Sequence, residues 1–222
     1  MQLRATVLAA GLAACLVTTA AIAQEATFDP ASLAGDDTLR QETFTADAAL
    51  AEATGRDIPV PFTLDIPVSD RFLTLIDSAP SGGVVKISFA LGGEEGRMRL
   101  LENLNILTAT LPEAEDGAGT ALLDRLLTQD AFPLAVQDFP EAKQITLEDI
   151  EIGGTAGRQL IGTYRIPSLG LMYLRLVALP DAEAENALVA IVNIDAQRVQ
   201  LASTSDLEST ITGRALETLS LR

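Results

Sequence analysis

The residue types that most often perform chemistry are almost missing from this 222-residue sequence. It contains no histidine, and its single cysteine, Cys15, lies in an apolar N-terminal stretch. This composition excludes the commonest general base, the usual zinc, copper and iron ligands, and the Ser-His and Cys-His nucleophile pairs. The remaining options are carboxylate pairs, Ser-Lys dyads, Tyr or Arg electrophiles, and oxygen-ligand sites for calcium or magnesium.

Serine and lysine do not stand at catalytic spacing. No serine occupies a G-x-S-x-G pattern, and neither Lys86 nor Lys143 has a serine three residues before it. The glycine-rich stretches GGEEG and GGTAG are not followed by the Lys-Ser or Lys-Thr pair of a phosphate-binding loop. The sequence therefore predicts no activated nucleophile and no bound cofactor.

Acidic residues gather in one predicted hairpin loop in a pattern that resembles the start of a calcium site. Asp181, Glu183 and Glu185 alternate there, but Asn186 and Val192 stand where an EF-hand needs glycine and glutamate. We interpret the three acids as a solvated hairpin tip. A looser oxygen-ligand site is the alternative.

Two further acidic groups have comparable interpretations. Glu113, Glu115 and Asp116 belong to a second predicted loop. Asp149 and Glu151 share one face of a predicted strand, which fits an acidic edge that discourages strand addition better than an acid/base pair. These clusters keep a carboxylate-dependent hydrolase or a calcium-binding domain open as the alternative function.

One predicted hairpin brings aromatic and cationic side chains together. A four-residue loop over 167–170 would place Tyr164 opposite Tyr173 and Gly162 opposite Arg175. Two tyrosines beside an arginine with a glycine across from it would form a shallow patch for a carboxylate or a partner peptide. In the alternative interpretation, the rings are ordinary cross-strand packing and Arg175 pairs with a neighbouring acid.

The N-terminal segment indicates the compartment. From Ala5 to Ala23 the chain is apolar and uncharged, and it ends in Ala21-Ile22-Ala23, a small-x-small pattern that signal peptidase cleaves. The sequence predicts a signal peptide over 1–23 and a periplasmic or secreted protein with no membrane span after cleavage. Two alternatives stay open, because Leu12-Ala13-Ala14-Cys15 resembles a lipobox that would lipidate Cys15, and an uncleaved leader would remain as a short membrane anchor.

The charge balance limits the possible partners. The chain carries 31 acidic and 15 basic residues, a net charge of −16. Nucleic acids and anionic lipid surfaces would be repelled, so neither is an expected partner. We expect this negative charge mainly to keep the protein soluble. Recognition of a specific cationic partner is the alternative interpretation.

Composition divides the exported chain into two parts. Residues 24–57 hold eight acids and few large apolar groups, so we expect a flexible acidic segment with a short helix near 46–53. Residues 58–222 alternate between patterned elements and turns, as a single folded domain does.

Hydrophobic periodicity places the strands of that domain. Alternating apolar residues predict strands in PFTLDIP and GGVVKISFALGG, and a third strand is expected over about 104–111. Three antiparallel strands follow at about 145–152, 158–166 and 171–179, with loops over 153–157 and 167–170. A central strand, ALVAIVNI, is apolar on both faces.

Two helices complete the pattern. In GTALLDRLLTQDAF the leucines form one stripe, which predicts an amphipathic helix closed by Pro133. At the C-terminus, Ser205-x-x-Glu208 has the spacing of a capping box that begins a helix. Gly213 lies inside this helix and costs about 1 kcal/mol relative to alanine, so we expect a close packing contact there.

The predicted fold is α+β, a mostly antiparallel sheet with a central amphipathic helix and a C-terminal helix packed on it. The order of elements resembles the PsbP-like family of α/β/α sandwiches, which includes photosystem extrinsic subunits and the bacterial DcrB proteins. The resemblance covers residues 58–222 and is carried by PFTLDIP, ALLDRLL, GRQLIGTYRI, LMYLRLVAL and DLESTITGRALETL. It implies a non-enzymatic accessory role and supplies no catalytic residues. We therefore expect an exported, non-catalytic binding or accessory protein with a protein or peptide partner.

Overall fold

A computed structural model describes residues 27–92, 97–112, 119–139, 141–183 and 185–222. The predictions for the leader, with Ala21, Ala23 and Cys15, lie outside the described residues, as do those for the acids of 113–116.

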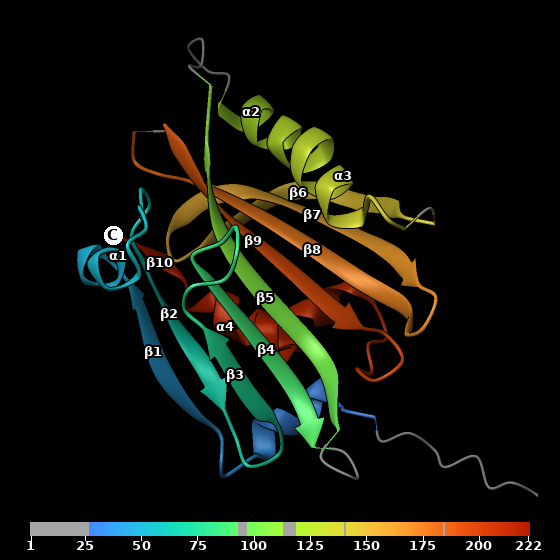
Figure 1. The fold of residues 1–222 in the computed structure, drawn as a ribbon. Helices are drawn as coiled ribbons and strands as arrows, with labels where there is room; N and C mark the ends of the chain where they lie inside the picture. Colours follow the sequence, from blue (N-terminus) through green and yellow to red (C-terminus); the bar gives the residue numbers. More distant parts are fainter. Residues whose placement is uncertain (1–26, 93–96, 113–118, 140, 184) are drawn as a thin grey trace, which may run out of the picture.

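Within the described residues, seven antiparallel strands form the larger sheet, in the order β3-β4-β5-β9-β8-β7-β6 (Figure 1). Their bounds are β3 Leu73–Asp77, β4 Val85–Gly92, β5 Met98–Thr110, β6 Lys143–Ile152, β7 Thr155–Ile166, β8 Gly170–Pro180 and β9 Asn186–Asp195. The loop expected over 153–157 is shorter than predicted. Gly153 and Gly154 alone make the turn, with φ of 57° and 79°, since glycine adopts this left-handed conformation without steric cost.

A smaller sheet has the order β1-β2-β10, with β1 Arg40–Ala46, β2 Phe62–Val68 and β10 Ser220–Leu221. The period of two predicted for PFTLDIP is confirmed, because Phe62, Leu64 and Ile66 are all buried. Strand β2 is central, so it pairs both with β1 and with the C-terminal β10.

Helices and the smaller sheet cover the two faces of the larger sheet (Figure 1). On one face lie α2 (Gly119–Arg125), a π-helical segment (Leu126–Ala131) and α3 (Phe132–Val136), which follow one another without a break. On the other lie α4 (Ile211–Glu217) and the smaller sheet. The α+β prediction is confirmed. No helix of the described residues is long and apolar enough to cross a membrane.

Each face of the larger sheet has its own hydrophobic core. On β8, Leu174 and Leu176 pack toward α2 and α3, whereas Val177 and Leu179 pack toward α4 and the smaller sheet. Burying a leucine or valine side chain stabilises the fold by roughly 1.5 to 3 kcal/mol. Because both faces are covered, β8 and β9 are apolar on both sides, as predicted for β9.

The central helix does not end at Pro133, contrary to the prediction. The preceding segment is a π-helix, in which the backbone N–H of Phe132 donates to the carbonyl of Leu127, five residues earlier. Proline lacks the N–H that an α-helix would use and clashes with the carbonyl four residues before it. The wider π turn relieves this conflict, and α3 continues to Val136.

The N-terminal segment is folded in its described part, so the predicted boundary at residue 58 is wrong. Phe28 and Leu33 are buried in the core, and residues Pro30–Gly35 form a 3-10 helix. Strand β1 pairs along its whole length with β2. The predicted short helix is confirmed as α1 (Ala48–Thr54), which is capped by Asp47.

The C-terminal helix begins later than predicted. The capping box joins Ser203 and Asp206, not Ser205 and Glu208, and it opens a 3-10 helix over Thr204–Ser209. Helix α4 starts only after Thr210, whose hydroxyl accepts from the backbone N–H of Gly213 at 3.0 Å. The predicted close contact at Gly213 is confirmed, because a Cβ there would collide with the backbone carbonyls of Leu207 and Glu208.

Candidate binding site

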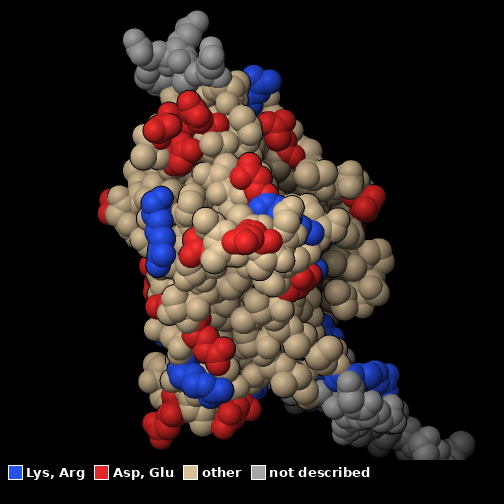
Figure 2. All heavy atoms as spheres, turned by 60° about the vertical axis from the view of Figure 1, so that its left-hand side comes forward, with Lys and Arg blue, Asp and Glu red and all other residues tan. Residues whose placement is uncertain are grey.

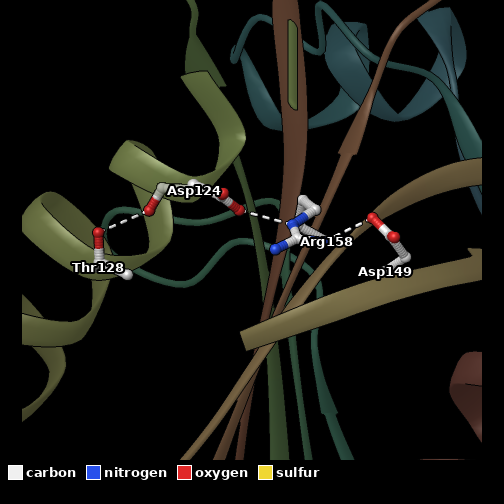
Figure 3. Close-up of polar contacts among 4 residues, drawn as sticks. All are labelled: Asp124, Thr128, Asp149 and Arg158. Atoms are coloured by element: carbon white, nitrogen blue, oxygen red, sulfur yellow. Dashed lines mark hydrogen bonds and ion pairs between the residues drawn. The ribbon is translucent and has the colours of Figure 1, made fainter. Parts of the chain in front are cut away.

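Arg158 on β7 links the larger sheet to α2. Its Nε donates to Oδ1 of Asp124 at 2.6 Å, and its Nη1 donates to Oδ1 of Asp149 at 2.5 Å (Figure 3). Asp149 is the register partner of Arg158 on β6, so both side chains leave the sheet on the face that α2 covers. The hydroxyl of Thr128 donates to the backbone carbonyl of Asp124 at 2.7 Å, one turn along the helix.

Arg158 is held as a cation by these contacts. Its side chain is 13% exposed, against 35% for Asp124 and 88% for Asp149. Burial alone would lower the pKa of Arg158, but the hydrogen bonds to Asp124 and Asp149 outweigh burial and raise the pKa above its ordinary value. The third nitrogen, Nη2, has no hydrogen-bond acceptor among the described residues, so it can donate to a ligand.

A pocket of about 270 Å³ opens beside Arg158, between α2 and the ends of β6, β7 and β8. It is lined mainly by apolar groups, among them Leu111, Leu122, Leu123, Ile150, Ala156 and Pro180. The small side chain of Ala156 leaves this space open. The volume falls just below the range of about 300 to 1,000 Å³ that is usual for drug-sized ligands. The pocket can therefore take one large apolar group with a hydrogen-bond acceptor next to it.

The predicted register of the β7–β8 hairpin is wrong by one residue. Ile166 pairs with Gly170, whose φ is 94°, so the loop has three residues rather than four. As a result Tyr164 pairs with Met172, and Tyr173 pairs with Thr163. A shift of one residue moves a side chain to the other face of a sheet. Tyr164 and Tyr173 therefore lie on opposite faces.

The three residues of the predicted patch are not gathered on one surface. Tyr164 is buried under α3, where its hydroxyl donates to Oδ1 of Asn193 at 2.8 Å. Burial raises its pKa. Tyr173 packs against the opposite core, and Arg175 is buried on that same side, with Ile161 rather than Gly162 as its register partner.

Gly162 has a different role from the one predicted. It pairs with Leu174, and a Cβ on it would lie 2.7 Å from Cε2 of Phe132 and 2.8 Å from the carbonyl of Lys143. The missing side chain thus leaves room for α3 to dock on the sheet.

Asp181, the first acid of the hairpin loop after β8, serves the turn itself. Asp181 accepts from the backbone N–H of Glu185 at 3.0 Å and from the side-chain amide of Asn186 at 3.1 Å. In the described part of the chain, no three carboxylates are grouped so that they could hold a metal ion.

Sequence reasoning did not find the Arg158 site. Arg158 and Asp124 are 34 residues apart and meet only because α2 docks on β7. One of its contacts could have been predicted from the sequence. A two-residue turn at Gly153-Gly154 makes Asp149 the register partner of Arg158.

Comparison with known proteins shows similarity only among solved structures. No protein-family model and no curated protein matches the chain. The solution structure of cyanobacterial PsbP (CyanoP) from Synechocystis sp. PCC 6803 aligns with a TM-score of 0.48 and 12% identity, over 83% of this chain and 93% of that one. A Pseudomonas aeruginosa protein of unknown function aligns with a TM-score of 0.39 and 17% identity, over 72% and 97%.

The Ran-binding protein Mog1p of Saccharomyces cerevisiae also aligns, with a TM-score of 0.37 and 9% identity, over 81% of this chain and 90% of that one. A PsbP structure is thus among those that the chain resembles, as the sequence predicted. At these values the likeness carries no information about ligand or partner.

Proposed function

We propose that this protein is an exported, non-catalytic binding protein that holds a partner polypeptide at the pocket beside Arg158. An apolar side chain of the partner enters the pocket, and the neighbouring backbone carbonyl of the partner accepts from Nη2 of Arg158. The observation that carries the proposal is an apolar pocket with one oriented, unused donor on its wall.

Charge defines the chemistry of the partner further. Asp149 is mostly exposed at the pocket, and Glu148 and Glu151 are exposed on the same edge strand. The whole chain carries −16. Figure 2 shows one face of the molecule, where acidic side chains are spread widely and basic ones stand singly or next to acids. A partner segment with lysine or arginine beside its apolar residue would be attracted by this negative charge. The attraction would also speed association.

Composition supports binding rather than turnover, since the sequence lacks histidine and keeps its one cysteine in the leader. The leader supports export through the Ala21-Ile22-Ala23 pattern. N-terminal sequencing of the protein from the envelope fraction tests this part. A start at Gln24 is expected, an acylated start at Cys15 would indicate a lipid anchor, and an intact Met1 would contradict cleavage.

The binding part is tested with an array of nine-residue peptides that carry leucine, phenylalanine or serine at the centre and lysine or glutamate on either side. We expect binding to the apolar, lysine-flanked peptides. Thr120→Trp places a ring in the pocket and should weaken binding by about tenfold or more, equal to about 1.4 kcal/mol. Ala121→Trp, an exposed neighbour on α2 outside the pocket lining, is the matched control.

Equal binding of serine-centred peptides would contradict the proposal, as would a Thr120→Trp variant that binds like the wild type. The absence of binding by every peptide in the array would contradict it as well.

A further inference from the structure

Arg175 lies on the other face of the larger sheet, under α4, and is only 5% exposed. Its Nε donates to Oε1 of Gln159 on β7 at 2.9 Å. The amide nitrogen of Gln159 donates in turn to Oε1 of Glu148 on β6 at 2.7 Å. Three neighbouring strands thus present a row of polar side chains on this face.

The two terminal nitrogens of Arg175 are unused within the described chain. No described residue accepts a hydrogen bond from Nη1 or Nη2, and none forms an ion pair with this guanidinium. Nitrogens of a buried guanidinium that lack an acceptor favour a bound ligand or counter-ion, because a buried charge is costly unless it is fully paired. Arg175 lines a pocket of about 220 Å³ between β6 and α4, which is where such a ligand would bind.

The other charged groups of this pocket are acidic. Glu151, Glu208 and Glu217 line it together with Arg175. Burial lowers the pKa of Arg175, and the negative charges of Glu208, Glu148 and Glu217 counteract burial only in part. The pocket is therefore lined by one basic and three acidic side chains.

Two glycines fix the walls of the pocket. Gly153 and Gly213 both line it, and a Cβ on either would collide with a backbone carbonyl, of Leu219 and of Leu207 respectively. The turn between β6 and β7 is thus packed at backbone distance against Leu219, and the start of α4 against Leu207. A pocket with such walls keeps its shape before a ligand arrives, which lowers the cost of binding.

We propose that this pocket binds a small zwitterion, such as a free α-amino acid, with its carboxylate on the terminal nitrogens of Arg175 and its ammonium group between Glu208 and Glu217. A simple anion would be repelled by the glutamates, and a simple cation would be repelled by Arg175. A molecule with both charged groups on one carbon satisfies both sets, and the planar fork of the arginine guanidinium matches a carboxylate in particular. The volume suits a ligand smaller than the usual drug-sized molecule.

The test compares ligands that differ by one charge. Glycine, L-alanine, L-serine and L-proline are titrated into the full chain up to about 10 mM by calorimetry, and thermal melts are recorded in parallel. Ethylamine and propanoate are the controls, since they are L-alanine without its carboxylate and without its amino group. We expect saturable binding and a higher Tm with at least one amino acid, and no effect from ethylamine or propanoate.

Variants locate the site. Arg175→Gln should abolish binding, and Glu217→Gln, an exposed position whose exchange leaves the core intact, should weaken it several-fold. Glu183→Gln, an exposed glutamate outside this pocket, is the matched control. Thr120→Trp should leave amino-acid binding unchanged, which separates this site from the peptide site.

Three results would overturn the inference. They are no binding by any of the four amino acids, binding of propanoate or ethylamine as tight as that of L-alanine, and equal binding by the Glu217→Gln variant.

Discussion

The carboxylate of Glu102 on β5 accepts a hydrogen bond from the hydroxyl of Thr212 on α4 at 2.6 Å. It also accepts from the backbone N–H groups of Ile211 at 3.2 Å and Thr212 at 2.8 Å. These groups belong to the first turn of α4, where backbone donors have no partner within the helix. A buried side chain of the sheet thus caps the C-terminal helix and fixes its position.

Removal of this cap should destabilise the fold strongly. Glu102→Ala would leave the buried backbone N–H groups of Ile211 and Thr212 without an acceptor, each at a cost of about 1 to 3 kcal/mol, so we expect a loss of about 2 kcal/mol or more. Thr212→Val removes one donor and keeps the carboxylate, and should cost less. Equilibrium unfolding in urea measures both, and equal losses would contradict the capping role.

The same carboxylate should make stability depend on pH. Burial raises the pKa of Glu102 above the ordinary value of 4.5, and the hydrogen bonds from Thr212, Ile211 and Thr210 only partly oppose this. The folded state then holds a proton that the unfolded state has released. The contribution of Glu102 is therefore fully present below pH 4.5 and is lost as the pH rises through the folded pKa.

Glu102→Gln removes this titration. The difference in unfolding free energy between wild type and Glu102→Gln should change in favour of the variant as the pH rises from 4.5 through the folded pKa, and then level off. Parallel urea titrations of the two proteins across this range give the difference directly. A difference that stays constant with pH would show that the pKa is not raised.

The two aspartates that contact Arg158 should contribute unequally. Asp124 is partly buried and joins α2 to the sheet, so Asp124→Asn should cost about 1 to 2 kcal/mol. Asp149 is almost fully exposed, and exposed ion pairs contribute about 0 to 1 kcal/mol, so Asp149→Asn should cost less. Urea unfolding at low and high salt measures both, and a larger loss for Asp149→Asn would contradict this order.

The sequence pattern identified the strands that alternate clearly or are apolar on both faces. Strands β2, β4, β7, β8 and β9 lie where they were predicted, because burial of one or both faces dictates their residue types. The edge strand β1, RQETFTA, was missed because five of its seven residues are polar or charged and little of it is buried. Strand β10 has only two residues, too few for any period.

The site depended on details that single-sequence patterns do not determine. Tyr164 and Tyr173 would share a face if the β7–β8 loop had four residues. The loop has three, because Gly170 adopts a positive φ and pairs with Ile166. The contact between Asp124 and Arg158 depends on how a helix docks, which involves the π-helical turn before Pro133. The local spacing of residues in the sequence predicts neither the length of this loop nor the docking of α2.

The folded N-terminal segment gives the last prediction. Leu33 is 1% exposed and belongs to the main core, although its neighbours in sequence are small or acidic. Leu33→Ala should therefore cost about 2 to 5 kcal/mol, the usual loss for a buried leucine. Leu134→Ala makes the same chemical change at a residue that is 66% exposed and should cost far less. Urea unfolding of the two variants decides the matter, because a flexible 24–57 segment would make Leu33→Ala as mild as Leu134→Ala.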